Sequence, residues 1–101
     1  MPKGYAIFTE TIKDRAGYDG YVMKALPTIL QTGGKAIVAD DNPEVIEGDW
    51  HGPRVVILEF DSVEAARDWY NSPEYQAIVG ERFASADADA AIVSGFEMPG
   101  G

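Results

Sequence analysis

The pattern of apolar residues along the chain predicts four strands, separated by segments with helical spacing. The strand-like segments are rich in β-branched and aromatic residues and are bounded by glycine, proline or aspartate. They comprise residues 4–12, 35–39, 54–60 and 91–96. We expect the third of them, with its four consecutive apolar residues at 55–58, to be central in the sheet. A short extended segment is expected over residues 44–48, whereas the Ala-Asp repeat over residues 84–91 is expected to be weakly structured at first.

Between these strands, apolar residues recur every three or four positions, the spacing of an amphipathic helix. Asp14 is expected to cap the first helix, Pro27 to kink or divide it, and Gly33-Gly34 to end it. A second helical region begins at the capping-box-like pair Asp61 and Glu64, and Ser72-Pro73 restarts it. The predicted inward-facing residues are Tyr18, Tyr21, Val22, Ala25, Leu26, Ile29, Leu30, Val63, Ala66, Trp69, Tyr70, Tyr75, Ile78, Val79 and Phe83.

The predicted order of elements is βαββαβ, which is typical of the α+β ferredoxin-like fold. In this fold an antiparallel four-stranded sheet carries helices on one face. We therefore expect a single domain over residues 1–101.

The strands do not alternate between apolar and polar residues as a sheet with one solvent-exposed face would. Residues 54–60 present Val56, Leu58 and Phe60 to one side and Val55 and Ile57 to the other. A second apolar face requires a second cover, and the simplest cover is another copy of the same sheet. We therefore predict a homodimer in which the two sheets form a barrel. The alternative is that the C-terminal tail or the segment 40–53 folds over its own sheet.

Composition and charge limit the classes of partner. The 101 residues contain 17 Asp and Glu against 8 Lys and Arg, giving a formal net charge of -9 that repels nucleic acids and anionic membranes. No cysteine is present, so thiol chemistry and zinc-thiolate sites are excluded. There is no signal-peptide pattern and no apolar run of the ~20 residues that span a bilayer. We expect a soluble cytoplasmic protein.

Several motifs resemble those of a bacterial family known as domain of unknown function number 1330. They are Glu47-Gly48-Asp49-Trp50, Arg54-Val55-Val56-Ile57-Leu58-Glu59-Phe60 and Trp69-Tyr70-Asn71-Ser72-Pro73-Glu74-Tyr75, with Pro27 and Gly33-Gly34. The resemblance covers nearly the whole chain. It implies a dimeric α/β barrel, in a superfamily that includes cofactor-independent monooxygenases, lactone isomerases, haem-degrading enzymes and relatives of dye-decolourising peroxidases. It implies no established activity.

Familiar cofactor and metal motifs are absent from the sequence. There is no glycine-rich nucleotide loop, no nucleophile elbow and no pair of histidines at metal-binding spacing. The acidic segment 40–44 is not an EF-hand loop, because Val45 stands where that loop requires glycine. We predict no metal and no cofactor, and do not expect haem at His51, which lies in a predicted loop.

Glu59 is the first candidate catalytic residue. If the helices cover Val56, Leu58 and Phe60, then Glu59 points with Ile57 into the opposite, barrel-facing side. A carboxyl group buried there must be paired, neutralised or hydrated, and burial would suit it to general acid or base chemistry. The alternative is a structural ion pair or hydrogen bond with a lysine or a strand tyrosine.

A second cluster lies within residues 47–54. Arg54 is a candidate clamp for an anionic group, His51 a candidate proton carrier, and Trp50 a stacking wall beside the carboxylate of Glu47. The alternative is that Arg54 pairs with Glu47, Trp50 packs at the dimer interface and His51 is exposed.

The remaining aromatic residues have structural interpretations. Trp69, Tyr70 and Tyr75 have the spacing of core residues, whereas the hydroxyl of Tyr18 or Tyr21 could reach a cavity between helix and sheet. Three hypotheses follow: a cofactor-independent enzyme using that cavity, a dimeric small-molecule-binding module, and a structural dimer with a fully packed interior.

Overall fold

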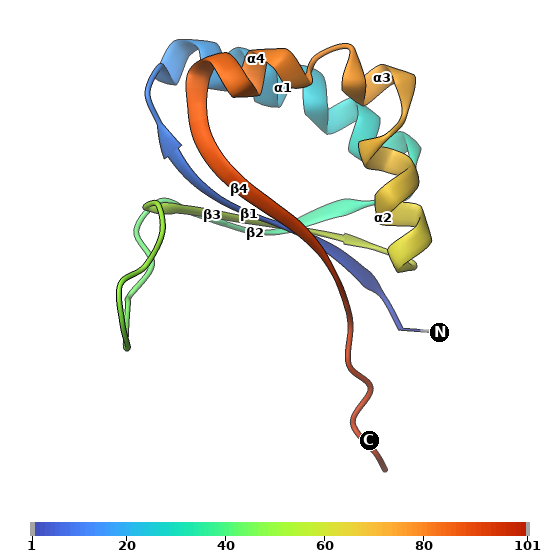
Figure 1. The fold of residues 1–101 in the computed structure, drawn as a ribbon. Helices are drawn as coiled ribbons and strands as arrows, with labels where there is room; N and C mark the ends of the chain where they lie inside the picture. Colours follow the sequence, from blue (N-terminus) through green and yellow to red (C-terminus); the bar gives the residue numbers. More distant parts are fainter. Residues whose placement is uncertain (1, 101) are drawn as a thin grey trace.

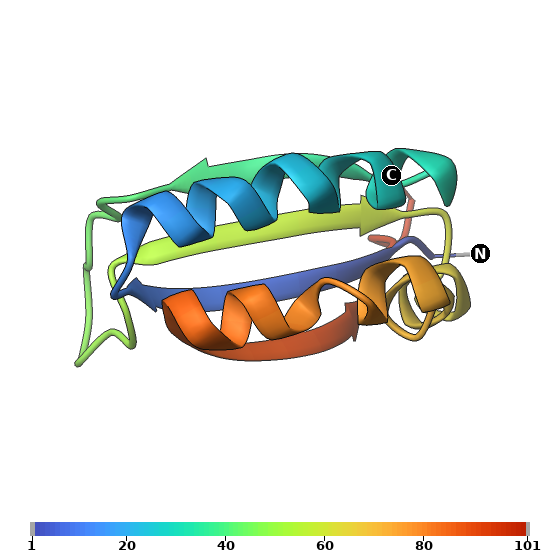
Figure 2. The ribbon, with the colours of Figure 1, turned by 90° about the horizontal axis from the view of Figure 1, so that it is seen from above.

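The computed structural model describes residues 2–100 and has a four-stranded antiparallel sheet with helices packed on one face (Figure 1). The sheet order is β2-β3-β1-β4, which confirms the predicted ferredoxin-like fold. The elements are β1 (Gly4–Ile12), α1 (Arg15–Gln31), β2 (Lys35–Asp40), β3 (Arg54–Phe60), α2 (Val63–Tyr70), α3 (Pro73–Gln76), α4 (Val79–Ser85) and β4 (Ala86–Ser94). Viewed from above, α1 and α4 lie over the sheet along the direction of the strands (Figure 2).

Alternation along β1 and β3 determines which residues enter the core. In β1 the buried side chains are those of Ala6, Phe8 and Glu10, and in β3 those of Leu58 and Phe60. These residues face the helices, where Trp69 and Tyr75 are completely enclosed. The core assignment of both aromatics is confirmed. The indole Nε1 of Trp69 donates a hydrogen bond of 3.0 Å to Thr28 Oγ1, so its burial leaves no unsatisfied donor.

The helix ends follow the predicted capping with one correction. Asp14 accepts a hydrogen bond from the amide of Gly17, and Ser72 accepts one from Tyr75, as expected. The predicted capping box of Asp61 and Glu64 is wrong, because Ser62 is the N-cap residue of α2 and accepts from the amide of Ala65 at 3.0 Å. Helix α1 continues through Pro27 as one element to Gln31.

The structure departs from the sequence prediction in three further places. Strand β4 begins at Ala86 and not at residue 91, because residues 86–94 pair in register with β1 despite the low strand propensity of alanine and aspartate. Phe83, predicted to face inward, is 58% exposed, and Arg82 takes the buried position with its guanidinium carbon 5.2 Å from the centre of the Phe8 ring. The extended segment expected at 44–48 is not a strand.

The face of the sheet opposite the helices is uncovered. Ile7 on β1 and Ile57 on β3 are paired across this face and remain partly exposed. The loop 41–53 and the tail 95–100 both extend to this side of the sheet, one from each end (Figure 1). They flank the open face and do not fold over it, so the sheet keeps its second apolar face. No helix among residues 2–100 is long and apolar enough to cross a membrane.

Gly4 holds the start of β1 against the N-terminus of α2. A Cβ atom at Gly4 would overlap the backbone carbonyl of Ser62, which is fixed by its role as helix cap, whereas a Cβ at Gly20 on α1 would meet nothing within 4 Å. We expect Gly4→Ala to lower the free energy of unfolding by about 1–3 kcal/mol, the usual cost of overpacking. Gly20→Ala, the matched control, is expected to raise it by about 0.5–1 kcal/mol. Urea denaturation of both variants measures the difference, and equal stabilities would contradict this packing.

Candidate functional site

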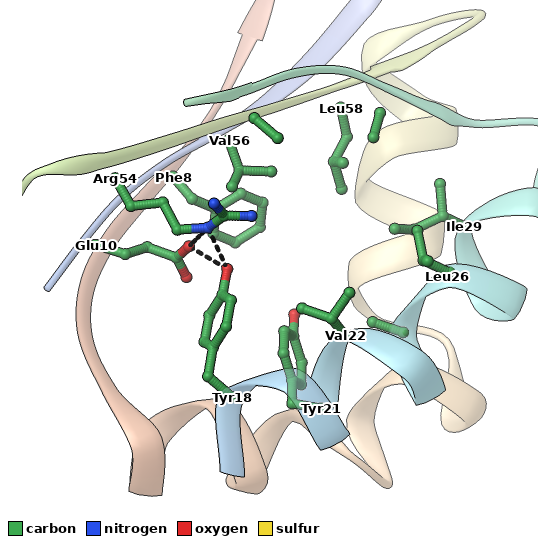
Figure 3. Close-up of a pocket in the computed structure, with 13 residues that line it drawn as sticks. Phe8, Glu10, Tyr18, Tyr21, Val22, Leu26, Ile29, Arg54, Val56 and Leu58 are labelled. Atoms are coloured by element: carbon green, nitrogen blue, oxygen red, sulfur yellow. Dashed lines mark hydrogen bonds and ion pairs between the residues drawn. The ribbon is translucent and has the colours of Figure 1, made fainter. Parts of the chain in front are cut away.

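A cavity of about 140 Å³ lies between α1 and strands β1, β2 and β3 (Figure 3). Its walls are mainly apolar side chains of the helix and of the covered face of the sheet. The lining residues are Phe8, Glu10, Tyr18, Tyr21, Val22, Ala25, Leu26, Ile29, Ala36, Ala39, Arg54, Val56 and Leu58. A cavity of roughly 150 Å³ is large enough to bind benzene. The cavity therefore suits a ligand of about the size of a single ring.

Three polar side chains meet at one end of this cavity. The hydroxyl of Tyr18 donates a hydrogen bond of 2.5 Å to Oε1 of Glu10, and Arg54 Nε donates one of 3.1 Å to the Tyr18 oxygen. Arg54 Nε also lies 3.8 Å from Glu10 Oε1. Figure 3 shows the three groups converging from β1, β3 and α1. A carboxylate, a phenol and a guanidinium thus border one apolar cavity.

The strand register brings Glu10 and Arg54 together. The two residues are direct partners in the antiparallel pairing of β1 with β3, and both side chains lie on the helix-covered face. Glu10 is only 1% exposed. An unpaired carboxylate at that depth would be costly, so the hydrogen bond from Tyr18 and the nearby charge of Arg54 compensate for its lost hydration.

Arg54 also connects the site to the start of the loop 41–53. Its Nη1 donates a hydrogen bond of 2.8 Å to Oδ1 of Asp41, and this hydrogen bond lowers the pKa of Asp41. Arg54 therefore pairs with Asp41 and Glu10, and the predicted alternative of a pair with Glu47 across the loop is wrong. The guanidinium is held by residues from three different segments, which fixes its position at the cavity.

Both tyrosines of α1 that were predicted to reach a cavity line this one. Burial, together with the hydrogen bond to Glu10, raises the pKa of Tyr18 from 10.0 to about 12. The hydroxyl of Tyr21 lies 2.6 Å from that of Tyr75, and burial raises the pKa of Tyr21 as well. Both phenols therefore stay protonated at neutral pH.

Glu10 is the member of this cluster that sequence reasoning missed. Period-two geometry places Glu10 on the same face as Ala6 and Phe8, which is the argument that singled out Glu59. The signal was therefore present in the sequence. The sequence alone does not show that Tyr18, 8 residues further along the chain, and Arg54, the partner of Glu10 on the neighbouring strand, lie beside this carboxylate.

Glu59 lies on the open face of the sheet, away from the cavity. The hydroxyl of Tyr5 donates to its Oε2 at 3.1 Å, and Lys35 Nζ lies 3.5 Å from its Oε1. This hydrogen bond raises the pKa of Tyr5. The tyrosine and the lysine are the two partners that the structural interpretation of Glu59 anticipated.

The other predicted site residues lie on the loop 41–53. Glu47, Trp50 and His51 are exposed, on a loop that extends to the side of the sheet away from the helices (Figure 1). His51 borders a separate polar groove at the end of β1 and β4, together with Thr9 and Asp87. Of the five residues predicted as catalytic or substrate-binding, Arg54 alone lines the cavity between sheet and helices. Within residues 2–100, no three His, Asp or Glu side chains gather in a way that could hold a metal ion.

Residues 3–96 match the family described as domain of unknown function (DUF1330). The chain belongs to this family. The match confirms the resemblance seen in the sequence motifs and extends over both the cavity and the open face. Comparison with curated proteins finds no match.

Solved structures place the DUF1330 chain in a wider fold group. A Rhodopseudomonas palustris protein of unknown function is similar with a TM-score of 0.78 and 19% identity, over 96% of this chain and 85% of the other. SnoaB, a cofactor-independent oxygenase from Streptomyces nogalater, is similar with a TM-score of 0.69 and 11% identity, over 100% of both chains. At these identities the likeness shows the fold alone.

The pKa of Tyr18 makes the stability of the protein sensitive to alkaline pH. The unfolded chain releases this proton near 10.0 and the folded chain near 12, so between these values the folded state binds more protons and loses stability as pH rises. We expect the free energy of unfolding to fall between pH 10 and 12, with Tyr18 accounting for about 2 kcal/mol. Denaturant unfolding at each pH checks this. Tyr18→Phe should show a correspondingly shallower fall, and an equal fall in both proteins would contradict the assignment.

Proposed function

We propose that this DUF1330 protein is a cofactor-independent enzyme that acts on a small molecule in the cavity between α1 and the sheet. Glu10 is the proton acceptor, Arg54 holds the polar end of the substrate, and Tyr18 fixes the carboxylate of Glu10. The supporting observation is the convergence of a buried carboxylate, a phenol and a guanidinium at one end of an apolar cavity. Buried polar groups of this kind at a cavity are the usual mark of a functional site.

The chemistry available to these residues is proton transfer. Glu10 takes a proton from the substrate, and the negative charge that develops on the substrate is stabilised by the Arg54 guanidinium, which remains positively charged. Tyr18 donates to Glu10 and keeps its own proton at neutral pH, so it orients the base without competing with it. The fold of SnoaB, a cofactor-independent oxygenase, is compatible with such chemistry.

The alternative is a binding module that holds a small molecule without changing it. The same three groups would then recognise the ligand, and the apolar side chains that line the cavity would contribute affinity. Turnover separates the two proposals, because only an enzyme releases a product different from the ligand that entered.

A second location for the site is the open face of the sheet. Glu59 there is paired with Tyr5 and Lys35, and His51, Trp50 and Glu47 lie on the loop that flanks this face. A partner subunit would enclose these residues. In this arrangement Glu59 or His51 would carry the proton-transfer role that the sequence predicts for them.

A thermal-shift screen against small acids, phenols, quinones, flavins and haem tests the proposed location. A ligand at one hundred times its dissociation constant adds ~2.7 kcal/mol of stability, which raises the melting temperature of wild-type protein. We expect Glu10→Gln and Arg54→Met to weaken binding of any hit roughly ten- to a hundredfold, as the loss of a hydrogen bond to a charged group does. Glu81→Gln removes a carboxylate paired with Lys24 on the surface of α4 and is the matched control.

Two outcomes would contradict this location. One is a ligand whose affinity is unchanged in Glu10→Gln and Arg54→Met. The other is a ligand whose affinity is lost in Glu59→Gln or His51→Ala instead, which would move the site to the open face.

We infer that the protein is a homodimer in which the open faces of two sheets meet. Ile7, Val55 and Ile57 leave apolar surface on a face that no helix of this chain covers. The two segments that flank the face also carry exposed apolar side chains, with Ile46 83% and Phe96 81% exposed. A second copy related by a twofold axis would bury the face and both flanking segments at once.

Light scattering at micromolar concentration is expected to report about twice the chain mass of 10.9 kDa. Ile57→Asp places an unpaired charge in the centre of the buried face and should dissociate or unfold the protein. Met23→Asp is the matched control, because Met23 lies on α1 and is 73% exposed. A monomeric wild-type protein with a cooperative melt would overturn the dimer, and an intact Ile57→Asp dimer would show that another face is used.

A further inference from the structure

The polar end of the cavity has two atoms that are free to bind a ligand. Arg54 uses Nε and Nη1 in its contacts with Glu10, Tyr18 and Asp41, and its Nη2 makes no hydrogen bond to any of residues 2–100. Glu10 accepts through Oε1 alone. No fully enclosed polar side-chain atom in the described part of the chain lacks a partner. Neither Oε2 of Glu10 nor Nη2 of Arg54 is therefore fully enclosed, and both atoms belong to residues that line the polar end of the cavity.

The hydrogen-bonding requirements of these two atoms indicate which polar group would contact both of them. Nη2 is a hydrogen-bond donor and needs an acceptor, whereas a carboxylate Oε2 needs a donor. A hydroxyl group supplies both functions from one oxygen atom. A carboxylate ligand supplies no donor and would meet the like charge of Glu10, and an ammonium supplies no acceptor and would meet the charge of Arg54.

The rest of the cavity defines the body that carries this hydroxyl. The walls beyond the polar end are Val22, Leu26, Ile29, Val56 and Leu58, together with Phe8 (Figure 3). A volume of about 140 Å³ is close to the roughly 150 Å³ of a cavity that accommodates benzene. The part of the ligand inside the cavity is therefore apolar and about the size of one ring.

We propose that the cavity binds monocyclic phenols. The phenol ring occupies the apolar part, the O–H group donates to Glu10 Oε2, and the phenol oxygen accepts from Arg54 Nη2. This inference rests on the proposed function, because a hydroxyl group bound at Glu10 would supply the proton that this residue accepts, and among single-ring hydroxyl compounds phenols are the acidic ones.

Titration calorimetry with a matched set of probes tests the ligand class. The probes are phenol, benzene, benzoate, cyclohexylamine and the two-ring 2-naphthol, each added to wild-type protein at pH 7. We expect phenol to bind at least tenfold more tightly than benzene, benzoate or cyclohexylamine, because it alone satisfies both free atoms. 2-Naphthol should also bind more weakly than phenol, because its second ring exceeds the cavity.

Variants separate recognition of the hydroxyl from general loss of structure. Glu10→Gln and Arg54→Met should each reduce the preference for phenol over benzene by about tenfold, the effect of losing a hydrogen bond to a charged group. Benzene binding should change little, which shows that the apolar cavity is intact. Glu81→Gln, on the surface of α4, should keep the wild-type preference.

The outcomes distinguish this inference from the proposed function. Tighter binding of benzoate than of phenol would overturn the phenol class and leave a small-molecule site for anions in the cavity. Equal binding of phenol and benzene would also overturn it, because the polar end would then contribute no recognition. Binding of none of these probes and of no compound in the thermal-shift screen would overturn the proposed function itself.

Discussion

The carboxylate of Glu10 is buried in the apolar layer between the sheet and α1, and compensating for its burial ties three elements together. Tyr18 reaches it from α1, Arg54 faces it from β3, and Glu10 itself belongs to β1. Because removing one partner would leave a buried charge uncompensated, the helix cannot shift on the sheet at this end without losing stability. The same contacts keep the polar end of the cavity in a fixed geometry, which is what a binding or catalytic site requires.

The carboxylates on the two faces of the sheet, Glu10 and Glu59, differ in how many of their oxygens are hydrogen-bonded or ion-paired. On the covered face, Glu10 is buried beneath the protein's own helix, it lines the cavity, and its second oxygen has no hydrogen-bond partner among residues 2–100. On the open face, Glu59 has a tyrosine and a lysine as partners, one for each oxygen. A carboxylate with both oxygens engaged is less suited to accept a proton than one with a free oxygen beside an apolar cavity. This contrast is the reason for placing the proton-transfer role at Glu10.

The fold could be predicted from the sequence because each element has a local signal. The β-branched and aromatic residues of β1 and β3, the cap at Asp14 and the Ser72-Pro73 start of α3 are all short-range patterns. The errors occurred where long-range contacts override local preference. Residues 86–90 form a strand because β1 pairs with them, and Arg82 replaces Phe83 in the core because the Phe8 ring lies beneath its guanidinium. The same distinction applies to the candidate site. The residue type of Arg54 is enough to make it a candidate, whereas Glu10 becomes one only through strand register and its hydrogen bond from Tyr18.

The charge of the whole chain bears on what the cavity admits. A formal net charge of -9 produces a field that disfavours the approach of anions, and Glu10 and Asp41 add negative charge close to the guanidinium of Arg54, which lines the cavity. Arg54 is therefore already neutralised by its own partners and offers hydrogen bonds more than net positive charge. A site of this kind selects a neutral group that can both donate and accept, and it stabilises negative charge only when that charge forms on a ligand already bound. The proposed recognition of a neutral acid and the proposed transfer of its proton to Glu10 thus rest on the same arrangement of charges.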